Sequence, residues 1–386
     1  MSLGLFTTIL TRAEKTGNLV LWNKVTQTAQ EAIFTRSTPN GQSFNGAYRV
    51  NSNGFLEELY TDQPNWTYPI GGSASGDASL SFSKSGTQLL SHGKDLTNAM
   101  WLNNDLTVTS GITDIYNTSN AIRLTESGAG SNSAFQATVT GVSGNEYATG
   151  FWIKGISNFN DNISLRCAVL ASVDIVVTSD WKFHEITNTA DSTTIRSGIV
   201  LDANSGAIIE VCFPILNEGE LTIEHIPTTG STASRSQDIA TFTDLVDNKV
   251  FSPNSVGSVY MKLKSYKSYS TPLSYPFNDS SGVNLFSYVM RSYGATPFRY
   301  YYVDDNVGTT NDGALDENEP YIITFNGQNV KIYQPSGLVQ EYTSKILGNE
   351  IDQFNVPSTP NGTIEYEQIA FSPIALTEAE AIAALN

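Results

Sequence analysis

The chain has 386 residues, of which 40% are hydrophobic and 15% charged; this is enough apolar mass for two or three domains, so a disordered chain is not expected. Its net charge of −17 argues against nucleic acid and anionic membranes as partners, because binding to phosphates requires a basic surface. The polar residues are mainly Ser, Thr, Asn and Gly and the aromatic ones mainly Tyr and Phe, which favours strands and turns over helices.

We therefore expect an all-β protein in which an N-terminal attachment segment precedes two antiparallel β-sandwiches. Residues 1–37 hold apolar groups but too little chain for a core, so we expect them to attach the protein to a partner. The assembly residues would be Phe6, Leu10 and Trp22. Within this segment, Thr26–Phe34 has the pattern of a short helix.

Residues 38–90 are expected to form a small β lead-in region. Ala47–Val50 and Phe55–Leu59 flank an Asn-Gly pair, which supplies the positive φ angles of a tight turn. This pattern predicts a hairpin.

Two longer stretches have the pattern of β-sandwiches. Residues 91–227 and 239–386 contain short alternating strands separated by turn clusters, and residues 228–238 form a polar linker between them. The clearest strands are Leu106–Thr109, Ala134–Val139, Tyr147–Lys154, Asp180–Ile186, Val256–Leu263, Leu285–Met290, Phe298–Val303, Tyr321–Phe325, Val330–Tyr333 and Thr363–Phe371.

Three local features complete this pattern. Thr377 and Glu380 form a capping box that predicts a terminal helix over Ala379–Leu385. Cys167 and Cys212 lie in apolar runs and are expected to be buried free thiols. No apolar run reaches the ~20 residues of a membrane span, and the start of the chain lacks a basic region, so neither a span nor a signal peptide is expected.

Several motifs resemble a known family. Asp95–Trp101, followed by Leu106–Thr109, is similar to the opening of a carbohydrate-binding-module-like jelly roll of phage tail and fibre proteins, with Leu96 replacing the usual aromatic residue. The later motifs of that domain are matched by Tyr147–Lys154, Asp180–Lys182, Ile215–Gly219 and His225–Arg235. Lys331–Tyr333 and Ile369–Glu380 resemble the end of a concanavalin-A/laminin-G-like sandwich.

The resemblance implies a structural component of a bacteriophage virion: a tail fibre, spike, head fibre or head-decoration protein. Such a protein would be made in the host cytoplasm, and its lectin-like domains would attach to host-surface glycans. We expect a homotrimer that contacts other virion proteins through residues 1–37, because fibre proteins of this type assemble three-fold. A phage polysaccharide depolymerase and a secreted carbohydrate-binding adhesin are the alternatives.

Aromatic side chains are the candidates for glycan binding, because their rings stack on the apolar faces of sugars. These candidates are Tyr300, Tyr301, Tyr302, Trp152 and Trp181. For the two Trp residues, the alternative is a place in a sandwich core.

We expect no enzymatic activity and no cofactor. The motifs of zinc proteases and of serine hydrolases are missing, and the three His residues lie far apart in the sequence. Asp304, Asp305 and Asp312 belong to an acidic stretch that suits Ca²⁺, a cation that takes clustered oxygen ligands. The same stretch also fits a solvated hairpin loop.

Overall fold

The computed structural model describes most of the backbone from residue 85 onward and, before that residue, the strands β1 to β8. Side chains are not described before residue 85, nor over 264–276, 281–318 and 355–365. Further gaps lie at 128–131, 160–162, 221, 224, 236–238, 249, 279, 328 and 343–350.

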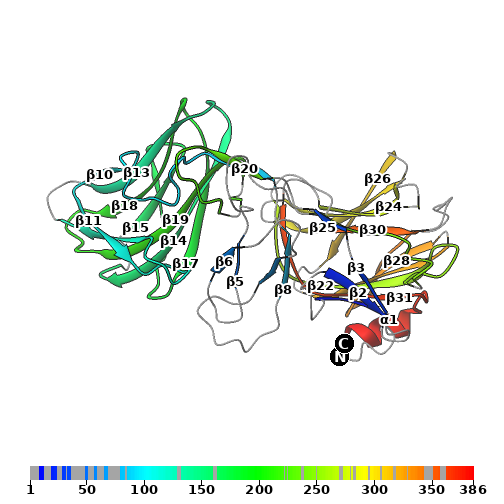
Figure 1. Cartoon of the computed structure of the whole chain (residues 1–386). Helices are drawn as coiled ribbons and strands as arrows, with labels where there is room; N and C mark the ends of the chain where they lie inside the picture. Colours follow the sequence, from blue (N-terminus) through cyan, green and yellow to red (C-terminus); the bar gives the residue numbers. More distant parts are fainter. Residues whose placement is uncertain are drawn as a thin grey trace.

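The first sandwich consists of two five-stranded antiparallel sheets (Figure 1). The β13 sheet has the strand order β10-β13-β18-β15-β16, and the β14 sheet has the order β11-β12-β19-β14-β17. The strands are β10 (Leu102–Asn104), β11 (Leu106–Ile112), β12 (Ala121–Glu126), β13 (Asn132–Thr140), β14 (Glu146–Ser157), β15 (Ile163–Cys167), β16 (Ser172–Asp174), β17 (Lys182–Thr189), β18 (Thr194–Asp202) and β19 (Ile208–Glu218).

The core of this sandwich lies between the two sheets and follows from alternation along each strand. Trp101 stacks on Phe135 of β13 with ring centroids 5.0 Å apart, and its edge meets Phe151 of β14. Each large side chain removed from water in this way contributes about 1.5–3 kcal/mol. Cys167 lies in the same core and Cys212 in a separate apolar cluster, and both are buried free thiols, as expected.

A latch of backbone and side-chain hydrogen bonds closes the end of the first sandwich. β9 (Gly86–Gln88) pairs with β20 (Ala233–Arg235), although these strands lie far apart in the sequence. The buried Gln88 amide donates to Pro214 O and accepts from Leu216 N, and the buried Thr228 hydroxyl accepts from Gly93 N and donates to Leu90 O. The expected linker at 228–238 therefore begins inside the first sandwich.

The second sandwich is also antiparallel. One sheet has the order β29-β28-β27-β22-β31-β1-β2-β3, with β7 and β8 attached beside β31; the other has the order β26-β25-β24-β23-β30-β21-β4. The strands are β21 (Ile239–Phe242), β22 (Val256–Ser268), β23 (Leu273–Asn278), β24 (Asn284–Tyr293), β25 (Thr296–Asp304), β26 (Val307–Leu315), β27 (Tyr321–Asn326), β28 (Asn329–Gln334), β29 (Gly337–Tyr342), β30 (Gln353–Val356) and β31 (Gly362–Ser372).

Phenylalanine rings fill the core of the second sandwich. Neighbouring ring centroids lie 4.9 to 6.4 Å apart, mostly in edge-to-face or tilted contacts, which is the arrangement that aromatic rings prefer. The rings belong to Phe251, Phe277, Phe325, Phe354 and Phe371. The expected all-β fold with two antiparallel sandwiches is thus confirmed.

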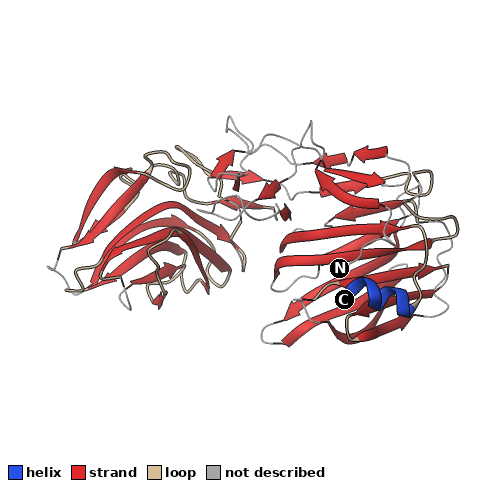
Figure 2. Ribbon diagram, turned by 90° about the horizontal axis from the view of Figure 1, so that it is seen from below, coloured by secondary structure: helices blue, strands red, loops and turns tan. Residues whose placement is uncertain are grey.

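A single helix appears in the described part of the chain and covers the second sandwich from outside (Figure 2). This helix, α1 (Glu378–Leu385), begins with the expected capping box of Thr377 and Glu380. Its buried residues Ala381, Ala384 and Leu385 pack against a cluster that includes Tyr260 and Tyr333.

The strands of the N-terminal region pair within the chain. β1 (Thr8–Arg12) pairs with β31 and with β2 (Leu19–Asn23), which in turn pairs with β3 (Thr28–Glu31). β4 (Ile33–Thr35) pairs with β21. Two expectations need correction: residues 1–37 contribute strands to the sheets of the second sandwich instead of standing apart, and Thr26–Phe34 holds strands instead of a helix.

The lead-in region contains the expected hairpin. β5 (Tyr48–Val50) pairs with β6 (Leu56–Glu58), with Val50 opposite Leu56. β7 (Asn65–Thr67) pairs with β8 (Ser79–Phe82), and β8 also pairs with β31.

Candidate functional site

The side of the β14 sheet that points away from the core carries charged and aromatic side chains. In β14, Phe151 and Ile153 lie in the core, so alternation places Trp152 and Lys154 on the opposite side. In β19, the neighbours of Glu210 on either side belong to the core, and Glu210 also points outward. We call this side the outer face.

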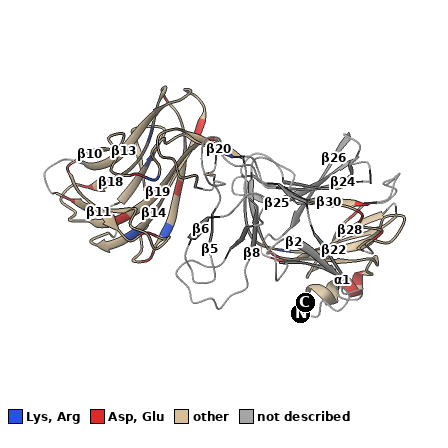
Figure 3. Ribbon diagram, in the orientation of Figure 1, with Lys and Arg blue, Asp and Glu red and all other residues tan. Residues whose placement is uncertain are grey.

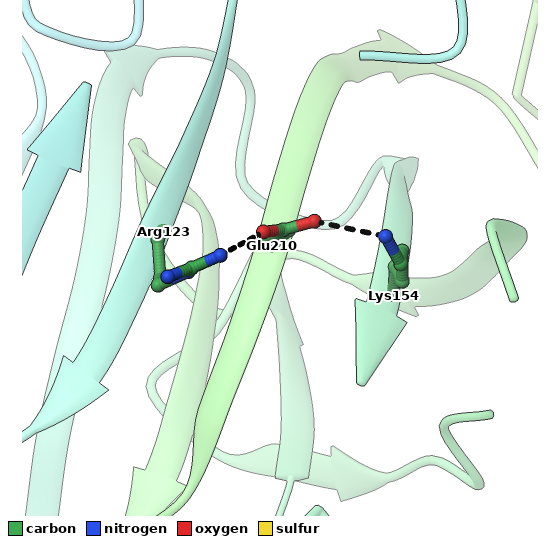
Figure 4. Close-up of polar contacts among 3 residues, drawn as sticks. All are labelled: Arg123, Lys154 and Glu210. Atoms are coloured by element: carbon green, nitrogen blue, oxygen red, sulfur yellow. Dashed lines mark hydrogen bonds and ion pairs between the residues drawn. The ribbon is translucent and has the colours of Figure 1, made fainter. Parts of the chain in front are cut away.

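Three charged residues form a row across the outer face (Figure 4). Glu210 lies opposite Arg123 of β12 and opposite Lys154 of β14 in the register of the sheet. Glu210 Oε1 accepts a hydrogen bond from Arg123 Nη2 at 2.6 Å, and its Oε2 accepts one from Lys154 Nζ at 3.3 Å. One carboxylate therefore binds two cations.

The burial of these three side chains differs. Glu210 is 5% exposed, whereas Arg123 and Lys154 are 40% and 34% exposed. A buried carboxylate is tolerated only when it is paired, and removal of one partner of a buried pair is costly. Glu210 therefore anchors the two cations, whose outer parts remain in contact with solvent.

Aromatic rings flank the charged row. Trp152 lies opposite Phe183 of β17, with ring centroids 5.5 Å apart. Gly150 makes this packing feasible, because a Cβ atom at this position would overlap with the Phe183 ring. Lys154 Nζ lies 6.0 Å from the centroid of the Trp181 ring, within the range of a cation–π contact.

The two Trp residues are thus neither fully exposed nor part of the core between the sheets. Both are half-buried and pack on the cluster that contains Cys212 and Phe213. Burial raises the pKa of the Cys212 thiol well above its ordinary value, so this cysteine stays protonated beneath the outer face.

A loop between β11 and β12 borders the outer face and is organised by one carboxylate. Asp114 is buried and accepts hydrogen bonds from the backbone N–H groups of Tyr116, Thr118 and Asn120 and from the Thr118 hydroxyl. The Tyr116 ring then meets Phe213 edge-to-face, with centroids 4.3 Å apart. The loop therefore extends the aromatic surface beyond the sheet.

The other candidate residues lie elsewhere. Tyr300, Tyr301 and Tyr302 belong to β25, opposite Met290, Val289 and Tyr288 of β24, and their side chains are outside the described residues. Only the backbone is described for four further candidates: Asp304 of β25, Asp312 of β26, Leu10 of β1 and Trp22 of β2. Neither backbone nor side chain is described for Asp305 and Phe6.

The described residues hold no cluster of three or more His, Cys, Asp or Glu side chains that could bind a metal. Because the acidic stretch from Asp304 to Asp312 is not part of that search, the Ca²⁺ interpretation stays a prediction. Likewise, none of the described helices is both long and apolar enough to cross a bilayer.

Sequence reasoning did not select Arg123, Lys154 and Glu210. A signal was present, because each is a charged residue between apolar neighbours in a strand, and charged residues are rare in this chain (Figure 3). What the sequence could not show is that the three share one row.

Comparisons with known proteins do not assign a function to the outer face. No family model matches the chain, and no curated protein matches it. Among solved structures, the chain is similar to the N-terminal CBM22-1–CBM22-2 tandem domain of Xyn10C from Paenibacillus barcinonensis, at 8% identity and a TM-score of 0.27, over 76% of this chain and 99% of that one. Because this TM-score is low, the likeness carries no argument about function.

Proposed function

We propose that the protein binds glycans through the outer face of its first sandwich. The observation that carries the proposal is the combination, on one sheet face, of the half-buried Trp152 and Trp181 with the anchored cations Arg123 and Lys154. An aromatic ring offers a flat apolar surface to a sugar ring, while the cations donate hydrogen bonds to its oxygens. Alternation on a rigid sheet holds these groups in place before a ligand arrives.

We further propose that binding is not followed by chemistry. Glu210 is the carboxylate at the centre of the outer face, and both of its oxygens already accept hydrogen bonds from cations. A general acid must instead hold a proton, and a retaining or inverting glycosidase needs two carboxyl groups across the scissile bond. Release of oligosaccharides from host capsule by the purified protein would contradict this and would favour the depolymerase alternative.

The biological setting that we propose is a bacteriophage particle. This part rests on the resemblance of Asp95–Trp101 and His225–Arg235 to virion proteins. In that setting the protein is a non-enzymatic fibre, spike or decoration protein, assembled as a homotrimer and attached to other virion proteins. Residues 1–37 would make this attachment from within the second sandwich, to whose sheets their strands belong. Mass spectrometry of purified particles tests the location, and light scattering tests the trimer.

Glycan binding is tested with a glycan array followed by calorimetry on the glycans that bind. Trp152→Ala and Trp181→Ala should each weaken binding about tenfold, which corresponds to ~1.4 kcal/mol for a lost ring contact. Leu102→Ala is the control, because this 50% exposed apolar residue pairs with Gln136 in the β13 sheet. Unchanged affinity in both Trp variants, with unchanged melting temperatures, would exclude the outer face as the binding site.

A further inference from the structure

We infer that the outer face selects anionic glycans, whose sugars carry carboxylate, sulfate or phosphate groups. This inference rests on the proposed function and names the ligand class of the same site. The charged row consists of two cations and one anion, and the anion is the buried member. A ligand on the outer face therefore meets Arg123 and Lys154 but not Glu210.

Both cations retain donors for a ligand. A guanidinium carries five N–H donors and an ammonium three. Among the described residues, Glu210 is the only hydrogen-bonding partner of the Arg123 and Lys154 side chains. Because Arg123 Nε is buried, the donors that a ligand can reach are those on the exposed end of the guanidinium.

Two other carboxylates near the outer face already accept hydrogen bonds from neutral donors of the chain. Asp114 is buried and accepts hydrogen bonds from its own loop. Glu185 of β17 accepts from the Thr222 hydroxyl at 2.5 Å. The row of two cations and one anion carries a net charge of +1, in contrast to the net charge of −17 of the whole chain.

The arrangement also indicates how a ligand would lie. Arg123 and Lys154 stand on the strands either side of β19, so their backbones are about 10 Å apart, two strand spacings. Trp181 lies next to Lys154. An acidic sugar can therefore place its anionic group on Lys154 and its ring on Trp181, with a second anionic group of the same chain near Arg123.

The test is an array that pairs each acidic polysaccharide with a neutral form. Polygalacturonate, alginate and hyaluronan are immobilised beside their carboxyl-reduced forms. Chondroitin sulfate is immobilised beside its desulfated and carboxyl-reduced form, and a phosphorylated mannan beside its dephosphorylated form. We expect binding to acidic forms, weaker by tenfold or more for the reduced forms, and weaker in 0.5 M than in 0.05 M salt, as surface electrostatics require.

Two charge variants should change glycan binding in opposite directions. Lys154→Met should weaken binding of the acidic glycan about tenfold, whereas Glu210→Gln, which removes the only anion of the row, should strengthen it severalfold. A purely structural role of the row would instead weaken binding in both. Arg196→Met is the charge-matched control, because Arg196 lies on β18 of the β13 sheet.

The outcomes separate the inference from the proposed function. Equal binding of acidic and reduced forms, or binding of neutral glycans alone, would overturn the inference and leave glycan binding intact. If Arg196→Met weakens binding and Lys154→Met does not, the anionic ligand binds the other sheet and the inference fails. Absence of binding to every glycan, acidic or neutral, would overturn both.

Discussion

At the scale of single residues, the first sandwich depends on buried polar side chains whose hydrogen bonds are made within the chain. Gln88 holds the backbone at Pro214 and Leu216, Asp114 holds the loop beside Tyr116, and Glu210 holds two cations. Leaving any of them unpaired would destabilise the folded state, because a buried polar group without a partner loses its hydrogen bonds to water and gains none in return. These residues therefore restrict the chain to one arrangement.

His225 should make the stability of the first sandwich depend on pH. Burial lowers the pKa of His225 from 6.5 to about 3, and its ring lies 4.9 Å from Phe213. Above pH 6.5 the imidazole is neutral in both the folded and the unfolded protein. Below pH 6.5 it becomes protonated in the unfolded protein but stays neutral in the folded one. The free energy of unfolding therefore falls by about 1.4 kcal/mol per pH unit as the pH falls from 6.5 towards 3.

Urea unfolding at pH 7 and pH 5, followed by tryptophan fluorescence, measures this loss. In His225→Gln, which cannot titrate, the loss between these two pH values should be smaller by about 2 kcal/mol. The variant has its own reference stability, so only the change with pH is compared. Parallel losses in the two proteins would show that His225 does not contribute.

At the scale of elements, the sequence predicted what alternation and capping encode. The strands around Trp152 and Phe183 follow from period-two patterns, and helix α1 follows from Thr377 and Glu380. Pairing between distant strands was not predictable, because Arg123 and Glu210 are separated by 87 positions and no local pattern links them. The outer face can therefore be recognised only once the strand order of the sheet is known.

The cap of helix α1 should contribute measurably to the stability of the second sandwich. The Thr377 hydroxyl accepts from Glu380 N, and the Glu380 carboxylate accepts from Thr377 N at 2.9 Å. Thr377→Ala should cost about 1 kcal/mol and speed hydrogen exchange in the first turn of the helix. Thr377→Ser keeps the hydroxyl and should behave like the original protein; equal losses in both variants would refute the role of the cap.

At the scale of the whole molecule, the first sandwich is an insertion between strands of the second. β1, β4 and β8 precede it in the sequence, yet they pair with β31, β21 and β31, which follow it. Its own ends meet where β9 pairs with β20. An inserted unit whose ends lie side by side can fold without the rest of the chain.

A fragment of residues 85–235 should therefore unfold cooperatively, whereas one of residues 91–227 should be less stable by several kcal/mol. The shorter fragment lacks both latch strands, the buried Gln88 with its hydrogen bonds, and the buried Ala233. Thermal unfolding followed by circular dichroism compares the two. Equal melting temperatures would show that the latch is dispensable.

The pairing of β1 with β31 also matters during synthesis on the ribosome. One partner of β1, the strand β2, leaves the ribosome directly after it, but the other partner, β31, emerges only with Gly362–Ser372, after both sheets of the inserted sandwich are complete. Domains generally fold as units while translation proceeds, so the inserted sandwich can form early. Throughout that interval β1 has an exposed edge that can pair with another chain. On crowded polysomes, misassembly between neighbouring chains should therefore affect the second sandwich.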